Sequence, residues 1–310
     1  MGVKLLSKLL KSKCYKESKK IHLSELCGKK ICVDASIYLY RFKSQDALLE
    51  NMYIMCSLFK KYNIIPLFVF DGKPPKEKIP ELELRKEERK QAKLEYEEIK
   101  ENMGDELCNA NKYKLERLKR SMIKITKEDV WKVLDLLKSY GIKTITAKGE
   151  ADVLCASLVM KKKVHAVLTE DMDLFAYGCP YVLRYFSLSN HTCILYDLNL
   201  ILSKLNLNMN DFKVLCVLSG NDYYGGKNNI YHNLSLYNKF KLSELSISFM
   251  DWLLIEGYVN EEENGKILNI LNMYNSIENE LRKYSYFIIN FGKINRKCLK
   301  SILEMERFIF

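Results

Sequence analysis

Residues 64–75 read Ile-Ile-Pro-Leu-Phe-Val-Phe-Asp-Gly-Lys-Pro-Pro, an apolar run that stops at an acid and two prolines. A short, continuous apolar run is typical of a strand that is buried on both faces of a parallel sheet. Pro74 and Pro75 cannot extend a hydrogen-bonded ladder, so the strand ends near Phe70. The run therefore predicts a central strand with Asp71 at its carboxyl end.

The segments on either side repeat this arrangement. Residues 31–34 form a second apolar run, and helical periodicity over 47–62 joins the two runs into a β-α-β unit. Further strands are predicted over 142–147, 164–169 and 181–186, and helices over 129–140 and 150–160. Strands that alternate with helices are typical of an α/β fold with a central, mostly parallel sheet flanked by helices.

Seven acidic residues follow these apolar runs, or the run over 214–219: Asp34, Asp71, Glu150, Asp152, Asp171, Asp173 and Asp222. Singly, each is an ordinary turn former or helix-capping residue. Together they are expected to converge, because the carboxyl ends of parallel strands meet at one edge of a sheet. Two carboxylates about 5 Å apart repel by roughly 3 kcal/mol at an effective dielectric near 20, so convergence requires cations. Oxygen ligands without nearby His or Cys favour Mg²⁺ or Mn²⁺ over zinc.

Divalent ions held in this way suit the hydrolysis of a phosphodiester. Two such ions lower the pKa of a water molecule and stabilise the leaving oxygen, so no protein nucleophile is needed. The rest of the sequence agrees with this interpretation, since its four histidines are isolated and it has no G-x-S-x-G sequence and no Walker A glycine loop.

Composition indicates a polyanionic partner and a reducing environment. The chain has 310 residues, 48% of them hydrophobic, and a net charge of +11, which favours nucleic acid although Lys-rich surfaces also serve solubility. Its ten cysteines are irregularly spaced without a CxxC, so a reduced, intracellular protein is expected. We expect neither secretion nor a membrane span, because no signal-peptide core and no apolar run of about 18 residues occurs.

Residues 78–132 are rich in Glu, Lys and Arg, a pattern of exposed helices that project from the core as an insertion. The spacing of Lys78, Arg85 and Arg89 places all three on one helix face. That face would either neutralise charge on a transferring phosphate or be an ordinary solvated surface. A second basic run, which is expected to contact nucleic-acid backbone, comprises Lys112, Lys114, Arg117, Lys119, Arg120, Lys124 and Lys127.

The chain resembles the flap endonuclease family, the structure-specific 5′ nucleases that include the XPG-type repair nucleases. The resemblance covers roughly residues 1–225 and appears in family order. It is carried by Met1-Gly2-Val3, Val33-Asp34-Ala35-Ser36 with Tyr38 and Tyr40, Val69-Phe70-Asp71-Gly72-Lys73-Pro74-Pro75, Gly149-Glu150-Ala151-Asp152, Thr169-Glu170-Asp171-Met172-Asp173 and Leu218-Ser219-Gly220-Asn221-Asp222-Tyr223.

The resemblance assigns roles to these positions. It makes Asp34, Asp71, Glu150 and Asp152 ligands of a first metal ion, and Asp171, Asp173 and Asp222 ligands of a second, with Asp152 able to bridge. It implies that Lys78 and Arg85 contact the scissile phosphate. Tyr40, which otherwise reads with Tyr38 and Phe42 as core, would stack on a base, and Gly2 would lie near the substrate once Met1 is removed. The insertion at 78–132 would be an arch through which a 5′ single strand threads.

Some positions depart from the family pattern. Asp152 stands where the family usually has Glu, and residues 225–229, Gly-Gly-Lys-Asn-Asn, break the spacing of a helix-hairpin-helix, so a K⁺ site is not supported. The C-terminal residues 305–310 lack the pattern of a sliding-clamp peptide. We therefore predict a nuclease core over 1–225 and a divergent, helical, duplex-binding region over 226–310. A monomer is expected, in the nucleus by resemblance or in the cytoplasm if the source is a large DNA virus.

The sequence thus predicts a Mg²⁺-dependent 5′ flap endonuclease and 5′–3′ exonuclease that acts on branched DNA in replication, repair or recombination. Mn²⁺ should substitute for Mg²⁺, and the product should carry a 5′ phosphate. Two alternatives remain open from the residues. One keeps the fold but makes the protein a junction resolvase or a PIN-type RNase, and the other is a DNA-binding scaffold without catalysis.

Overall fold

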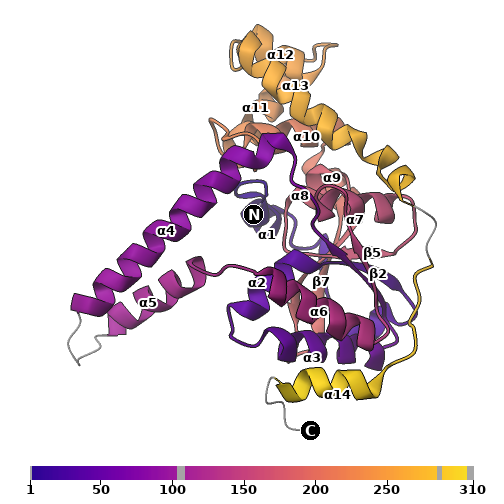
Figure 1. Ribbon diagram of the computed structural model, residues 1–310. Helices are drawn as coiled ribbons and strands as arrows, with labels where there is room; N and C mark the ends of the chain where they lie inside the picture. Colours follow the sequence, from indigo (N-terminus) through magenta and orange to yellow (C-terminus); the bar gives the residue numbers. More distant parts are fainter. Residues whose placement is uncertain (1, 103–108, 285–287, 306–310) are drawn as a thin grey trace.

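A seven-stranded sheet forms the centre of the computed structural model, which describes residues 2–102, 109–284 and 288–305 (Figure 1). The strands are β1 (Ser18–His22), β2 (Lys30–Asp34), β3 (Ile65–Phe70), β4 (Lys143–Thr146), β5 (Ala166–Leu168), β6 (Tyr181–Ser187) and β7 (Thr192–Asp197), in the order β1-β7-β6-β5-β2-β3-β4. Strands β2 to β6 pair in parallel, and β7 runs antiparallel to β6 and β1. The predicted mostly parallel α/β sheet is confirmed.

Helices cover both faces of this sheet, which explains why the central strands are continuous apolar runs. Along β2, Ile31 and Val33 pack into one hydrophobic core and Cys32 into the other, as expected when successive side chains point to opposite faces. The flanking helices are α1 (Leu6–Lys13), α2 (Ala35–Lys43), α3 (Leu48–Lys61), α6 (Lys127–Ser139), α7 (Ala151–Met160), α8 (Asp173–Ala176), α9 (Leu198–Leu205) and α10 (Met209–Leu218).

Two strands were not predicted. In β1 only Ile21 is buried, because the strand lies at the edge of the sheet, so its sequence carries no apolar run. Strand β7 pairs β1 with β6 and was missed as well. The apolar run before Asp222 belongs to α10, so this acid follows a helix.

The charged insertion is a helical hairpin that projects from the core (Figure 1). A 3₁₀ turn, η2 (Lys76–Lys78), leads into α4 (Ile79–Asn102), and α5 (Asn109–Ser121) packs back against it. The two helices are joined by ion pairs such as Lys114 Nζ to Glu95 Oε1 at 2.6 Å. Thr126 then begins α6 with a capping box to Asp129, so the insertion ends before the predicted limit at residue 132.

The region after α10 continues as helices: α11 (Ile230–Leu242), α12 (Phe249–Ile255), α13 (Glu261–Asn275), the 3₁₀ segment η3 (Ser276–Lys283) and α14 (Arg296–Met305). Helices α10 to α13 pack together at one end of the molecule, whereas α14 packs against α6 through Leu299 and Leu303 (Figure 1). Residues 306–310, on which most of the expectation about a clamp peptide rests, lie outside the described ranges. None of the described helices is long and apolar enough to cross a bilayer.

Candidate active site

Carboxylates from separate parts of the chain surround one cavity of about 250 Å³. Six of the seven acids line it: Asp34, Asp71, Glu150, Asp152, Asp171 and Asp222. The seventh, Asp173, is buried beside them, and its backbone N–H donates to Asp171 Oδ1 at 3.0 Å. Asp34 ends β2 and Asp71 follows β3, while Glu150 and Asp152 belong to the first turn of α7. The fold therefore gathers the seven acids at the carboxyl edge of the sheet.

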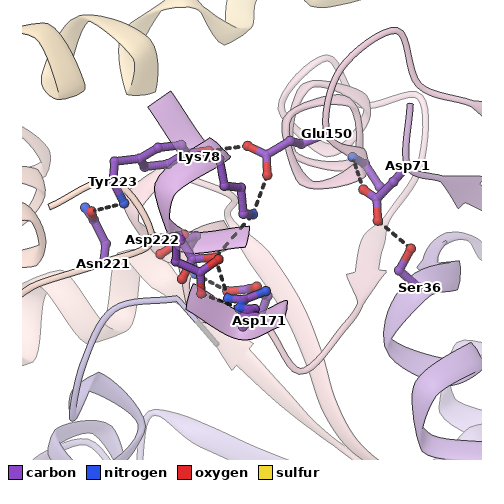
Figure 2. A network of polar contacts seen from close by, with 12 residues as sticks. Ser36, Asp71, Lys78, Glu150, Asp171, Asn221, Asp222 and Tyr223 are labelled. Carbon is purple, nitrogen blue, oxygen red and sulfur yellow. Dashed lines mark hydrogen bonds and ion pairs between the residues drawn. The ribbon is translucent and has the colours of Figure 1, made fainter. Parts of the chain in front are cut away.

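Hydroxyl groups hold two of these carboxylates in place. Thr169 Oγ1 donates to Asp34 Oδ2 at 2.8 Å. Ser36 Oγ donates to Asp71 Oδ2 at 2.5 Å (Figure 2). The backbone N–H of Ala151 donates to the other oxygen of Asp71 at 2.9 Å, which ties the end of β3 to the start of α7. Sequence reasoning gave Ser36 and Thr169 no role, although both stand in the short strings that carry the family resemblance.

Two buried carboxylate oxygens, Asp152 Oδ1 and Asp173 Oδ1, have no hydrogen-bond donor. An unpaired buried carboxylate oxygen is costly, and a cluster with only oxygen donors suits Mg²⁺ or Mn²⁺. The donor set therefore fits the expected ions. Across the described ranges, however, no three His, Cys, Asp or Glu side chains are placed to hold an ion as they stand. Some of the carboxylates must rotate for an ion to bind.

Burial and mutual repulsion favour protonation of this cluster. Burial raises the pKa of Asp34 to about 7, and the charge of Asp71 adds to the effect. Burial also raises the pKa of Asp152 well above its usual value, with further contributions from the charges of Asp171 and Asp34. The pKa of Asp173 is raised well above its usual value in the same way, first by burial and then by Asp171. Without metal ions the cluster therefore retains protons.

Two cations from the base of the insertion balance part of this charge. Lys78 Nζ binds Glu150 Oε1 and lies 3.2 Å from Asp222 Oδ2, and Arg85 Nη2 lies 3.1 Å from the same oxygen (Figure 2). Burial alone would raise the pKa of Asp222, but Lys78 and Arg85 outweigh it and hold that pKa below its usual value. The helical spacing that predicted a common face for Lys78 and Arg85 corresponds to a shared partner, Asp222.

The remaining predicted residues lie at different distances from the cavity. Tyr40 lines it and is 44% exposed, whereas Tyr38 and Phe42 are fully buried core residues. Gly2 has a φ of +74°, and a Cβ atom there would collide with Asp171 Oδ1, so only glycine fits against this acid. Arg89 Nε donates to the backbone oxygen of Arg85 at 3.1 Å.

Lys119 and Arg120 lie on α5, away from the cavity lining. Lys119 Nζ forms an ion pair with Asp46 Oδ2 at 2.8 Å, and Arg120 is exposed. These positions leave them on the projecting hairpin rather than among the acids.

Tyr223, like Ser36 and Thr169, was left without a role by sequence reasoning but contacts the acids directly. The Tyr223 hydroxyl donates to Glu150 Oε2, so Tyr223 and Lys78 together hold both oxygens of Glu150. Its position directly after Asp222 was the available signal, but the contact spans 73 positions of the chain and needed the fold to reveal it.

Comparisons of sequence identify two matching family models, the XPG N-terminal domain over residues 1–92 and the XPG I-region over residues 141–222. Flap endonuclease 1 of Encephalitozoon cuniculi is 36% identical over 240 residues, covering 72% of this chain and 68% of that protein. Flap endonuclease 1 of Glycine max is 33% identical over 242 residues, covering 72% of this chain and 62% of that protein. The chain thus spans about three fifths of the length of the first curated relatives that it matches.

Solved structures share the fold at lower identity. The catalytic core of Rad2 in complex with a DNA substrate superposes with a TM-score of 0.69 at 22% identity, covering 98% of this chain and 95% of that one. Human GEN1 in complex with Holliday junction DNA gives a TM-score of 0.64 at 22% identity, covering 99% of this chain and 74% of that one. The flap endonuclease of Methanococcus jannaschii gives a TM-score of 0.62 at 20% identity, covering 93% of this chain and 90% of that one. At these sequence identities the superpositions show a shared fold and nothing more.

Proposed function

The chain belongs to the flap endonuclease and XPG family, and on this premise we propose that it is a Mg²⁺-dependent, structure-specific 5′ nuclease. Its substrate would be branched DNA with a 5′ single-stranded flap, cut near the junction with the duplex to leave a 5′ phosphate. The observation that carries this proposal is the gathering of the acids around one cavity with Lys78 and Arg85 beside them. We expect the protein to act as a monomer in DNA replication, repair or recombination.

The metal-ligand roles proposed here are those that the family resemblance implies. Asp34, Asp71, Glu150 and Asp152 would hold one ion, and Asp171, Asp173 and Asp222 a second. When bound, Mg²⁺ or Mn²⁺ ions supply Lewis-acid stabilisation of the phosphate oxygens and a more acidic water. Thr169 and Ser36 orient Asp34 and Asp71 by donating hydrogen bonds to them.

Other residues would bind the DNA itself. Tyr40 has the exposure that stacking on a base next to the cut requires. Lys119 and Arg120 on α5, and Arg89 on α4, would contact backbone phosphates of a strand at the projecting hairpin. Gly2 lies against Asp171 and Asp173, which supports the proposal that the amino-terminal segment would lie close to the substrate.

A panel of labelled substrates tests the proposal. The purified protein is incubated with Mg²⁺ and a 5′ flap, a nicked duplex, a four-way junction or a single-stranded RNA, and the products are mapped at nucleotide resolution. We expect the flap to be cut fastest, near its junction, with no cleavage in EDTA. Preferred cleavage of the four-way junction would instead identify a resolvase, and preferred cleavage of RNA a PIN-type RNase. Binding without cleavage of any substrate would identify a DNA-binding scaffold.

Removing the cations beside Asp222 is expected to slow the chemical step more than it weakens binding. We expect Lys78→Ala and Arg85→Ala each to lower the single-turnover rate at saturating DNA by about 100-fold, because each loses electrostatic stabilisation of the phosphate. Lys90→Ala is the matched control, since Lys90 lies on α4, as Arg85 does, and pairs with Glu87 at 3.9 Å, away from the acids. Equal rates for Lys78→Ala and Lys90→Ala would contradict the assigned role.

A further inference from the structure

Three consecutive residues after α10, Asn221, Asp222 and Tyr223, each hold a different partner (Figure 2). Together they connect helix α13 to the acids. Asn221 is 8% exposed, and its Nδ2 donates to the Tyr274 hydroxyl at 2.9 Å. Its Oδ1 accepts from the backbone N–H groups of Tyr223 at 2.9 Å and Tyr224 at 2.8 Å. Asp222 binds Lys78 and Arg85, as described above. The Asn221 side chain thus fixes the backbone on both sides of Asp222.

Tyr223 contributes to the same site in two ways. Its hydroxyl donates to Glu150 Oε2, and its ring centroid lies 6.0 Å from Lys78 Nζ, which holds the other oxygen of Glu150. The Tyr177 hydroxyl lies 3.3 Å from the Tyr223 hydroxyl. Because the single proton of Tyr223 is engaged with Glu150, Tyr177 must be the donor in this second contact. The two tyrosines therefore form a directed chain of hydrogen bonds that ends on the carboxylate.

The same network of contacts includes Tyr274 of helix α13. Tyr274 is the second-last residue of α13 and is 1% exposed. Its ring centroid lies 4.9 Å from that of Tyr177 and 6.4 Å from that of Tyr223, both edge to face. Tyr274 thus touches Asn221 through its hydroxyl and both other tyrosines through its ring. A displacement of α13 would be felt at Asp222 and Glu150 together.

We propose that Tyr223 is a positioning residue for Glu150, and that Asn221, Tyr177 and Tyr274 couple the placement of α13 to the geometry of the metal-binding acids. This inference rests on the proposed function of those acids and adds a connection between the C-terminal helices and the ions. Side chains that orient metal ligands from behind affect metal affinity or activity by about 10- to 100-fold when they are removed.

The competing explanation is that the tyrosines serve only to pack their rings. Removing the Tyr223 hydroxyl while keeping its ring distinguishes a positioning role from a packing role. Tyr223→Phe keeps the ring next to Tyr177 and Tyr274 but removes the donor to Glu150 Oε2. Tyr224→Phe is the matched control, because Tyr224 is the adjacent tyrosine and its hydroxyl pairs with Glu263 instead of a cavity acid. If the tyrosines served only to pack, the two variants would bind metal ions alike.

Isothermal titration with Mn²⁺ and single-turnover cleavage of a 5′ flap test the proposal. We expect Tyr223→Phe to bind Mn²⁺ about 10-fold more weakly or worse, and to be slowed by about 10- to 100-fold at a fixed Mg²⁺ concentration, with partial recovery at high Mg²⁺. Its affinity for flap DNA in Ca²⁺ and its melting temperature in EDTA should remain close to those of the wild type. Unchanged Mn²⁺ affinity and rate in Tyr223→Phe, or an equal loss in Tyr224→Phe, would overturn the proposal.

Tyr274→Phe tests the coupling to α13. This variant keeps the ring and removes only the hydroxyl that accepts from Asn221, so we expect weaker Mn²⁺ binding in the same direction as for Tyr223→Phe. Wild-type Mn²⁺ affinity in Tyr274→Phe would refute the coupling. The metal titration does not depend on cleavage: if the wild type cut no substrate but Tyr223→Phe still bound Mn²⁺ more weakly, the positioning role would stand and the proposed nuclease function would fail.

Discussion

Asp152→Asn is expected to abolish cleavage and, at the same time, to make the ion-free protein harder to unfold. Asp152 is half-buried beside the charges of Asp171, Asp34 and Asp71, and its buried Oδ1 has no hydrogen-bond donor. Asparagine has nearly the same shape but carries no charge, so it removes the cost of either keeping this carboxyl protonated at neutral pH or burying it as an anion beside the other acids. The same change removes a proposed metal ligand together with its charge, and we expect the cleavage rate to fall by about 1,000-fold or more.

Two measurements separate these effects. Melting temperature is recorded in EDTA at neutral pH, and flap cleavage is recorded in Mg²⁺ at saturating enzyme. Asp135→Asn is the control, because this exposed acid on α6 changes the net charge equally without touching the cavity. We expect the melting temperature of Asp152→Asn to be higher than that of the wild type, and the melting temperature of Asp135→Asn to equal that of the wild type. A lower melting temperature for Asp152→Asn, or cleavage at the wild-type rate, would show that Asp152 is not a strained metal ligand.

The stability of the ion-free protein is expected to fall as the pH rises from about 5 to 8, and Mg²⁺ should reverse that loss. The folded-state pKa of Asp34 is raised from 3.8 to about 7, and the pKa values of Asp152 and Asp173 are raised well above the usual value. A carboxyl with a raised folded-state pKa stabilises the fold below its unfolded value, and this contribution is lost as the pH rises through the folded-state pKa. For Asp34 that window runs from about pH 4 to 7, at about 1.4 kcal/mol per unit of pKa difference.

Two other acids affect the stability of the fold only at lower pH. Asp129 and Asp222 have lowered pKa values, so their contribution to stability is lost only as the pH falls toward their folded-state values. Between pH 5 and 8 the raised carboxyls therefore dominate. At the proposed site, metal ions would bind the deprotonated cluster, so we expect their stabilising effect to grow with pH.

Thermal unfolding in EDTA and in Mg²⁺ at pH 5.5 and pH 8 checks this linkage. We expect the melting temperature in EDTA to be lower at pH 8 than at pH 5.5, and the increase caused by Mg²⁺ to be larger at pH 8. An equal increase at both pH values, or no increase at either, would contradict the expectation that the acids form the metal site.

The central strands and their acids were predictable because both faces of the sheet are covered. That burial forces β2 and β3 to be continuous apolar runs, and an acid directly after such a run is visible in the sequence. The helical period likewise placed Lys78 and Arg85 together. Edge strand β1 left no comparable signal, since only Ile21 of its residues is buried.

The contacts that orient the acids were not predictable. Thr169 with Asp34, and Tyr223 with Glu150, meet only because strands and helices far apart in the chain are brought to the same edge. Their hydrogen bonds depend on side-chain geometry that no local pattern encodes. The end of the insertion was in principle readable, because Thr126 and Asp129 have the spacing of a capping box.

Crystals of the protein soaked in Mn²⁺ and measured at the manganese absorption edge test the central claim most directly. We expect two anomalous peaks inside the cavity, each within bonding distance of carboxylate oxygens from Asp34, Asp71, Glu150, Asp152, Asp171, Asp173 and Asp222. No manganese in the cavity, or manganese bound only at other surface acids, would contradict the assignment of this cluster as the metal centre.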